Sequence, residues 1–209
     1  MTGTGPGPAP GPASASATAG VVAPPVPLVN VANALTVVRL ALVPVFLVVL
    51  FVDDGHSAMW RWAAFGVFAV ASLTDTFDGD LARRWGLVTD FGKIADPIAD
   101  KALTGAALVG LSMLGELAWW ATVTIAVREV AVTLLRFWVL RHGVIPASRG
   151  GKIKTLLQTV ALGLAVMPLP DALDPVVGVL VFVAVVVTVV TGLDYLVRAL
   201  RLRARAGAR

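Results

Sequence analysis

The sequence predicts an all-α, polytopic membrane protein with six transmembrane helices. Of its 209 residues, 57% are hydrophobic and only 14% are charged, and the mean hydropathy is +0.85. A soluble domain of this size would not need so many apolar residues. The apolar residues also gather into six stretches that polar turns separate. Because the chain contains no cysteine, disulfide frameworks and thiolate metal sites are excluded.

The two ends of the chain differ in composition from the part between them. Residues 1–27 are rich in Pro, Gly, Ala, Ser and Thr and carry no charge, which is typical of a disordered tail. We expect residues 28–200 to form the six-helix transmembrane domain, and residues 201–209 to form a basic tail on anionic lipid headgroups. The predicted spans are 30–52, 58–84, 93–114, 117–140, 151–168 and 176–196.

The first span begins with a polar segment that precedes a purely apolar run. Asn30 or Asn33 can cap the helix, because a side-chain oxygen at this position accepts a hydrogen bond from the first turn. Asn33, Thr36 and Arg39 recur at helical spacing. A cap followed by an interfacial arginine that extends to the headgroups would account for all three.

The second and third spans carry four carboxylates at the ends that adjoin each other. Asp75 and Asp78 lie close together on one helix face, and Gly92, Asp96 and Asp100 share a face of the next helix. Small residues continue the first of these faces, namely Gly79, Ala82 and Gly86. If the two helices form a hairpin, the four carboxylates converge above a smooth groove.

Carboxylates at the edge of a membrane are costly and usually mark a functional site. Four together need compensation, and two divalent cations such as Mg²⁺ or Mn²⁺ would provide it because carboxylate oxygens are hard ligands. The alternative is a set of solvated acids on a loop, balanced by basic neighbours. These neighbours are Arg83, Arg84, Lys93 and Lys101.

The fourth and fifth spans contribute charged residues of two kinds. Arg128 and Glu129 fall near the middle of the fourth span, which is costly unless they face the protein interior. Either they pair structurally with other helices, or Arg128 helps to hold a substrate phosphate. The basic loop 141–154 is explained either by sorting of positive charge to the cytoplasm or by a phosphate site beside Gly150 and Gly151.

The distribution of charge predicts the orientation. Six spans place both termini, the loop 141–154 and the acidic stretch on one side, which the excess of Lys and Arg marks as cytoplasmic. We therefore expect a multi-pass protein of the cell membrane whose acidic site faces the cytoplasm. Interfacial tryptophans are expected at Trp60, Trp62, Trp119 and Trp120. The net charge of +4 indicates anionic lipid and phosphate as partners rather than nucleic acid, because no base-reading motif accompanies it.

The acidic stretch resembles the signature of the CDP-alcohol phosphatidyltransferases. It reads Asp75-x2-Asp78-Gly79-x2-Ala82-Arg83-x8-Gly92-x3-Asp96-x3-Asp100, and no signature position is missing. Residues 30–39 and 151–155 also resemble the phosphatidylglycerophosphate synthase branch of that family, although Ala32 stands where that branch usually has proline.

The resemblance implies the fold of that family and transfer of a phosphatidyl group from CDP-diacylglycerol to an alcohol, with release of CMP. It implies two divalent ions, Mg²⁺ or Mn²⁺, held by Asp75, Asp78, Asp96 and Asp100, with Asp100 as the general base. It also implies a homodimer. The CDP-binding residues that it implies are Asn33, Thr36, Asp75, Asp78, Gly79, Ala82, Arg83 and Gly86.

The resemblance favours glycerol 3-phosphate as the alcohol, which would make phosphatidylglycerophosphate. Its phosphate would be held by basic residues of the fourth and fifth spans and the loop between them, with Arg128, Arg136, Arg149, Lys152 and Lys154 as candidates. Inositol phosphate, or phosphatidylglycerol in cardiolipin synthesis, are alternatives within the family. A small membrane carrier that uses the four acids as a cation pathway is an alternative outside it, but the sequence shows no repeated broken helices.

Overall fold

The computed structural model is entirely helical in the part of the chain that it describes. That part comprises residue 3 and residues 30–85, 89–140 and 149–207, without the side chains of 32, 75–85, 90–94, 96, 137, 139–140, 149 and 205–207. The α-helices are α1 (Val31–Leu50), α2 (Ala58–Trp85), α3 (Asp90–Met113), α4 (Trp119–Leu140), α5 (Arg149–Val166) and α6 (Asp174–Gly207). Two short 3-10 helices are η1 (Val52–Gly55) and η2 (Asp171–Leu173). The all-α prediction is confirmed.

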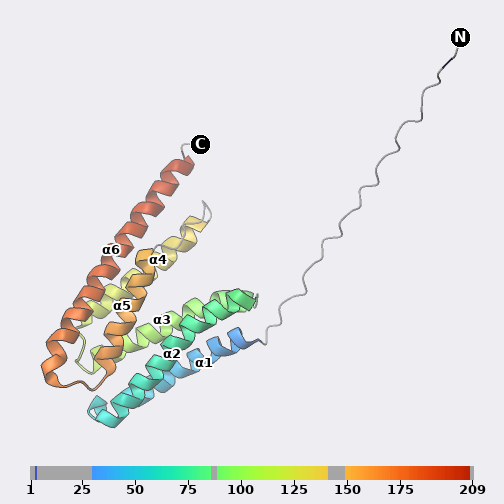
Figure 1. The fold of residues 1–209 in the computed structure, drawn as a ribbon. Helices are drawn as coiled ribbons and strands as arrows, with labels where there is room; N and C mark the ends of the chain where they lie inside the picture. Colours follow the sequence, from blue (N-terminus) through green and yellow to red (C-terminus); the bar gives the residue numbers. More distant parts are fainter. Residues whose placement is uncertain (1–2, 4–29, 86–88, 141–148, 208–209) are drawn as a thin grey trace.

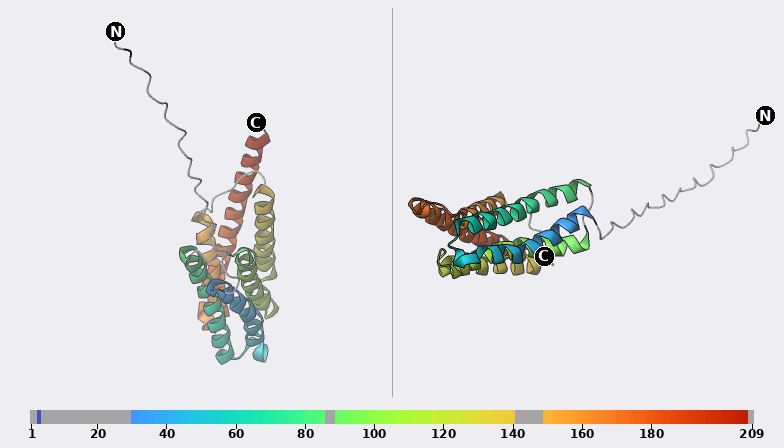
Figure 2. Two further views of the ribbon diagram at one scale, coloured as in Figure 1. Left: turned by 90° about the vertical axis from the view of Figure 1, so that its right-hand side faces the viewer. Right: turned by 90° about the horizontal axis from the view of Figure 1, so that it is seen from below.

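The helices form two groups that diverge from a common end (Figures 1 and 2). Helix α1 packs on α2 and α3, while α6 packs on α4 and α5; contacts of α3 with α4 and α5, and of α2 with α5, join the two groups. We call the end that carries η1, the turn 114–118 and η2 the closed end. The open end is where α2 ends and α3 begins, and where α4 ends and α5 begins.

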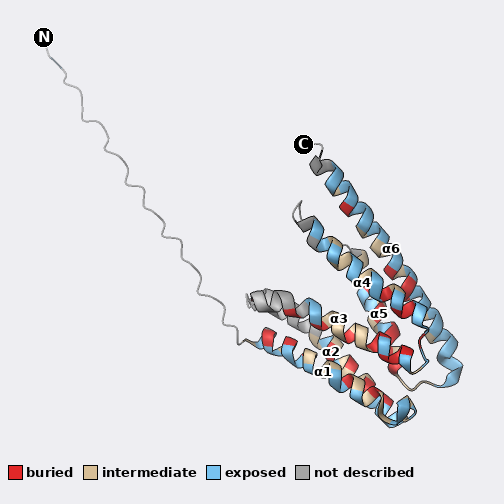
Figure 3. Ribbon diagram, turned by 180° about the vertical axis from the view of Figure 1, so that it is seen from behind, coloured by how far each residue is buried: buried red, intermediate tan, exposed pale blue. Residues whose placement is uncertain are grey.

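Buried apolar side chains lie mainly toward the closed end (Figure 3). Phe46 of α1, Phe68 of α2, Leu111 of α3 and Leu162 of α5 belong to one cluster. The outer faces of the helices are also apolar but exposed, with Val48, Leu134 and Val179 as examples. Exposed apolar faces of this extent are typical of a surface that contacts lipid or another protein.

Two of the described helices are long and apolar enough to cross a membrane. The stretches are Asn33–Leu50, which covers most of α1, and Asp171–Ala204, which covers most of α6. Ala58–Thr74 of α2 is a shorter apolar helix. The structure therefore supports a membrane span for two helices, and the other four predicted spans stay a prediction.

The observed start of the first helix agrees with the sequence prediction, whereas the last helix is longer than predicted. Asn30 is the N-cap of α1, and its Oδ1 accepts a hydrogen bond from the backbone N–H of Asn33 at 2.9 Å. Helix α6 continues to Gly207, so the first residues of the predicted basic tail extend this helix. The predicted tail at residues 1–27 lies outside the described residues, apart from residue 3.

Arg61, near the start of α2, joins three segments at the closed end. Its Nη2 donates to Oε2 of Glu116 at 2.6 Å, and its guanidinium also donates to the carbonyl oxygens of Val166 at 2.8 Å and Ala165 at 2.7 Å. Arg61 is only 5% exposed. It thus satisfies carbonyls at the end of α5 that no further helical turn can reach.

Arg61→Met is expected to lower the unfolding temperature by about 5–10 °C. Glu116 and two helix-end carbonyls would lose their donor, which costs about 2–3 kcal/mol. Thermal unfolding of detergent-solubilised protein, followed by circular dichroism, measures the shift. The matched control is Arg198→Met, because Arg198 pairs with Asp194 on an exposed helix face. Equal shifts in the two variants would contradict the assignment.

Candidate active site

The acidic residues of the sequence signature lie on two adjacent helices. Asp75 and Asp78 belong to α2, and Asp96 and Asp100 belong to α3. The two helices pack against each other, which is the arrangement that convergence of the four carboxylates requires. Both segments are helical throughout, which is the condition for each pair of acids to share a face.

Only part of this predicted site falls within the described side chains. Those of Asp75, Asp78, Gly79, Ala82, Arg83 and Asp96 are outside them, and residue Gly86 is outside the description altogether. Asp100 is described, is half-buried and lines a cavity. Among the described side chains there is no group of three or more His, Cys, Asp or Glu that could hold a metal ion. The metal site therefore stays a prediction.

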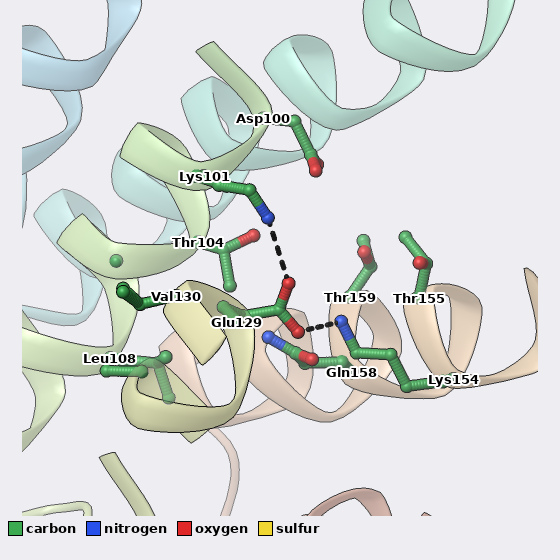
Figure 4. A pocket seen from close by; sticks show the side chains of 12 residues that line it. Asp100, Lys101, Thr104, Leu108, Glu129, Val130, Lys154, Thr155, Gln158 and Thr159 are labelled. Atoms are coloured by element: carbon green, nitrogen blue, oxygen red, sulfur yellow. Dashed lines mark hydrogen bonds and ion pairs between the residues drawn. The ribbon is translucent and has the colours of Figure 1, made fainter. Parts of the chain in front are cut away.

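The cavity beside Asp100 lies between α3, α4 and α5 (Figure 4). Its volume is about 150 Å³, which is room for a few water molecules or one small polar group. Polar side chains from all three helices line it, namely Asp100, Lys101, Thr104, Glu129, Lys154, Thr155, Gln158 and Thr159. Apolar residues such as Leu108 and Val130 form the rest of the wall.

Glu129 of α4 is the centre of an ion-pair cluster at this cavity. Its Oε2 accepts a hydrogen bond from Lys101 Nζ of α3 at 3.1 Å, and its Oε1 accepts one from Lys154 Nζ of α5. Arg128 Nη1 also donates to Oε1, at 3.0 Å. One carboxylate therefore connects cations from three helices, which explains how charge is tolerated inside the bundle.

The guanidinium of Arg128 extends from this cluster to α6. Its Nε donates to the carbonyl oxygen of Thr188 at 3.0 Å, and its Nη2 donates to Thr191 Oγ1 at 3.1 Å. Of the two alternatives for Arg128 in the sequence analysis, the structure shows the pairing with other helices. A phosphate contact by Arg128 stays a prediction.

The other predicted phosphate ligands are placed differently. Lys154 is buried and lines the cavity, whereas Lys152 and Arg136 are exposed and do not line it. The side chain of Arg149, the first residue of α5, lies outside those described. Among the predicted phosphate ligands whose side chains are described, Lys154 is thus the one that lines the same cavity as Asp100.

The polar residues of α1 are enclosed. Asn33 and Thr36 are buried, and Asn33 Oδ1 accepts a hydrogen bond from the hydroxyl of Thr89, just before α3. Arg39 is 1% exposed, so the interpretation as an interfacial arginine that extends to the headgroups is wrong. Its side chain is enclosed instead, on a helix that packs on α2 and α3. The predicted nucleotide contacts of Asn33 and Thr36 are not tested.

Sequence reasoning missed three polar residues near the site. Lys101 appeared only as a balancing charge, although it follows Asp100 directly. Thr89 gave no signal in the sequence. Gln158 lies one helical turn after Lys154 in α5, and this spacing could have placed it on the same face.

Comparison with known proteins identifies related chains over most of the length. A model of the family described as CDP-alcohol phosphatidyltransferase matches residues 29–190. A Mycobacterium tuberculosis (strain H37Rv) protein named "Probable phosphatidylglycerophosphate synthase" is 55% identical over 172 residues, which cover 82% of each chain. A Bacillus subtilis (strain 168) protein named "CDP-diacylglycerol--glycerol-3-phosphate 3-phosphatidyltransferase" is 36% identical over 79% of this chain and 93% of its own.

Proposed function

This chain belongs to the CDP-alcohol phosphatidyltransferase family, and we propose that it transfers a phosphatidyl group from CDP-diacylglycerol to sn-glycerol 3-phosphate. The products are phosphatidylglycerophosphate and CMP. The choice of glycerol 3-phosphate as acceptor rests on the 55% identity, over 82% of both chains, to a protein named as a probable phosphatidylglycerophosphate synthase. The complete Asp signature on α2 and α3 supports the transfer chemistry.

The donor set fits two divalent ions. Carboxylate oxygens on two packed helices are the ligands that Mg²⁺ and Mn²⁺ prefer, and Asp75, Asp78, Asp96 and Asp100 would hold them. When bound, such ions stabilise negative charge on the attacking and leaving oxygens. The small residues Gly79 and Ala82 let the pyrophosphate of the nucleotide approach the backbone of α2.

Asp100 is the general base in this proposal. Its carboxylate lies at the cavity between α3, α4 and α5, where the acceptor hydroxyl can come within hydrogen-bond distance. Asp100 removes the hydroxyl proton while the oxygen attacks the β-phosphorus, and CMP leaves. Lys154 lines the same cavity and offers a positive charge to the acceptor phosphate.

We place the open end of the molecule at the cytoplasm. All six helices would span the membrane, with the apolar outer faces toward lipid. Four exposed tryptophans lie in the first turns of α2 and α4, which follow the closed end, as expected for the opposite interface; they are Trp60, Trp62, Trp119 and Trp120. Helix α6 starts at η2, at the closed end, and carries exposed arginines such as Arg201 in its C-terminal part. The homodimer implied by the family resemblance stays a prediction.

Product identification tests the proposed function directly. Purified protein is given CDP-diacylglycerol with glycerol 3-phosphate, inositol phosphate or phosphatidylglycerol, and the lipid product is identified by mass spectrometry. Phosphatidylglycerophosphate should form, with CMP released in equal amount. A product from another alcohol alone would change the acceptor, and cation transport without CMP release would support a carrier.

Gly79→Leu is expected to weaken binding of CDP-diacylglycerol by about tenfold or more, because it adds bulk where the nucleotide approaches the helix backbone. Direct binding of a CDP-lipid to the detergent-solubilised variant measures this. Gly66→Leu is the matched control, since it lies on the same helix and an added Cβ there meets nothing within 4 Å. Unchanged affinity in Gly79→Leu would mean that the small face serves helix packing instead.

A further inference from the structure

Among the described side chains around the cavity, cations outnumber carboxylates. Lys101, Arg128 and Lys154 are three cations, and they face two carboxylates, Asp100 and Glu129, among the described side chains. A partly buried site with surplus positive charge favours an anion, because the surplus is weakly screened by water. Glycerol 3-phosphate would bring about two negative charges in its phosphate, as other phosphate monoesters do.

Gln158 gives a second and independent indication that the cavity takes a polar guest. The residue is only 3% exposed, and its Oε1 is buried without a hydrogen-bond partner in the described part of the chain. Its side chain lines the same cavity as Lys154 (Figure 4). Buried amide oxygens are nearly always hydrogen-bonded, so this oxygen indicates that a ligand or water occupies the cavity.

Glu129 itself is held firmly in place. Arg128 bonds to it at 3.0 Å and is anchored in turn to the Thr188 carbonyl and the Thr191 hydroxyl of α6. The two lysines, by contrast, are flexible side chains with four-carbon stems, and their ammonium groups are point charges without a fixed direction. Glu129 therefore brings the ammonium groups of two long side chains, from α3 and α5, to one place.

We propose that Glu129 is a positioning residue, which holds the ammonium groups of Lys101 and Lys154 together so that they receive the phosphate of the acceptor. The inference rests on the proposed function, because it takes the acceptor to be a phosphate monoester. Ordering the lysines in the folded protein reduces the entropy that substrate binding would otherwise lose. Glu129 does not touch the reacting atoms.

Glu129→Gln separates this role from simple charge competition. If Glu129 positions the lysines, the KM for glycerol 3-phosphate rises about tenfold, while the KM for CDP-diacylglycerol stays within about twofold. If Glu129 only competes with the substrate for the lysines, removing its charge lowers the KM for glycerol 3-phosphate. A lowered or unchanged KM overturns the proposal.

Glu116→Gln is the matched control, because it removes a carboxylate from the Arg61 ion pair at the closed end. It is expected to reduce thermal stability without changing the ratio of the two KM values. Should Glu129→Gln not fold, Lys101→Gln carries the test, since it leaves Glu129 with two cations. The KM for glycerol 3-phosphate should rise several-fold in this variant, and an unchanged KM would refute the role of Lys101.

A double-mutant cycle tests whether Glu129 acts through Lys154. In a Lys154→Gln background, Glu129→Gln should add much less to the KM for glycerol 3-phosphate than it does alone. If the effects of Glu129→Gln and Lys154→Gln on this KM are fully additive, Glu129 does not act through Lys154. Failure of the function itself looks different: the unaltered protein would then make no phosphatidylglycerophosphate, whereas failure of this inference leaves its turnover intact.

Discussion

Asp75→Asn, Asp78→Asn and Asp96→Asn are each expected to reduce CMP release by about 1,000-fold or more while the protein still inserts and folds. The reason is that an amide lacks the charge that a divalent ion requires of its ligands. These residues lie on two packed helices, α2 and α3, whose backbone geometry an isosteric substitution does not disturb. The loss should therefore appear in turnover rather than in stability.

Titration of Mg²⁺ and Mn²⁺ separates a metal defect from a folding defect. CMP release is measured over the titration, together with the unfolding temperature. Asp194→Asn provides the control, because Asp194 is an exposed carboxylate on α6 that pairs with Arg198. Near-normal turnover in one of the three variants, at ordinary metal concentrations, would remove that residue from the set of ligands.

The helices could be predicted because their signals are local. The apolar runs end at turn residues, and Asn30 caps α1 through a bond to a residue three positions away. Arg39 shows where local pattern fails. Whether its charge reaches the headgroups or is enclosed depends on how α2 and α3 pack on α1. Arg61 is similar, since its partners Ala165 and Val166 lie more than a hundred residues away in sequence.

The candidate site likewise has features that the sequence predicts and features that depend on contacts between helices. Helical spacing placed Asp96 and Asp100 on one face of α3, and this needed no tertiary information. The cavity depends on three helices meeting, and Glu129 is separated from Lys101 by 28 residues and from Lys154 by 25. No sequence spacing connects such partners. The sequence could therefore indicate a costly charge at Glu129 but not its partners.

Lys154→Gln is expected to lower kcat/KM for glycerol 3-phosphate by about 100-fold. A charge-assisted hydrogen bond to a phosphate contributes about 1.5–3 kcal/mol, and the exposed neighbours of Lys154 are poorly placed to replace it. Lys154 is 7% exposed and lines the cavity that contains Asp100. Its ammonium donates a hydrogen bond to Glu129 beside the cavity (Figure 4), so it faces the cavity rather than bulk water.

Lys152→Gln gives the sharpest comparison, because both lysines precede the same apolar run of α5 and differ mainly in burial. Lys152 is exposed and does not line the cavity, so screening by water and salt should make its effect much smaller. Steady-state kinetics with each substrate varied separately, at low and at high salt, measures both. A larger loss from Lys152→Gln would place the acceptor phosphate outside the cavity, toward the open end. Equal losses for both substrates in Lys154→Gln would assign Lys154 to the nucleotide or to the fold.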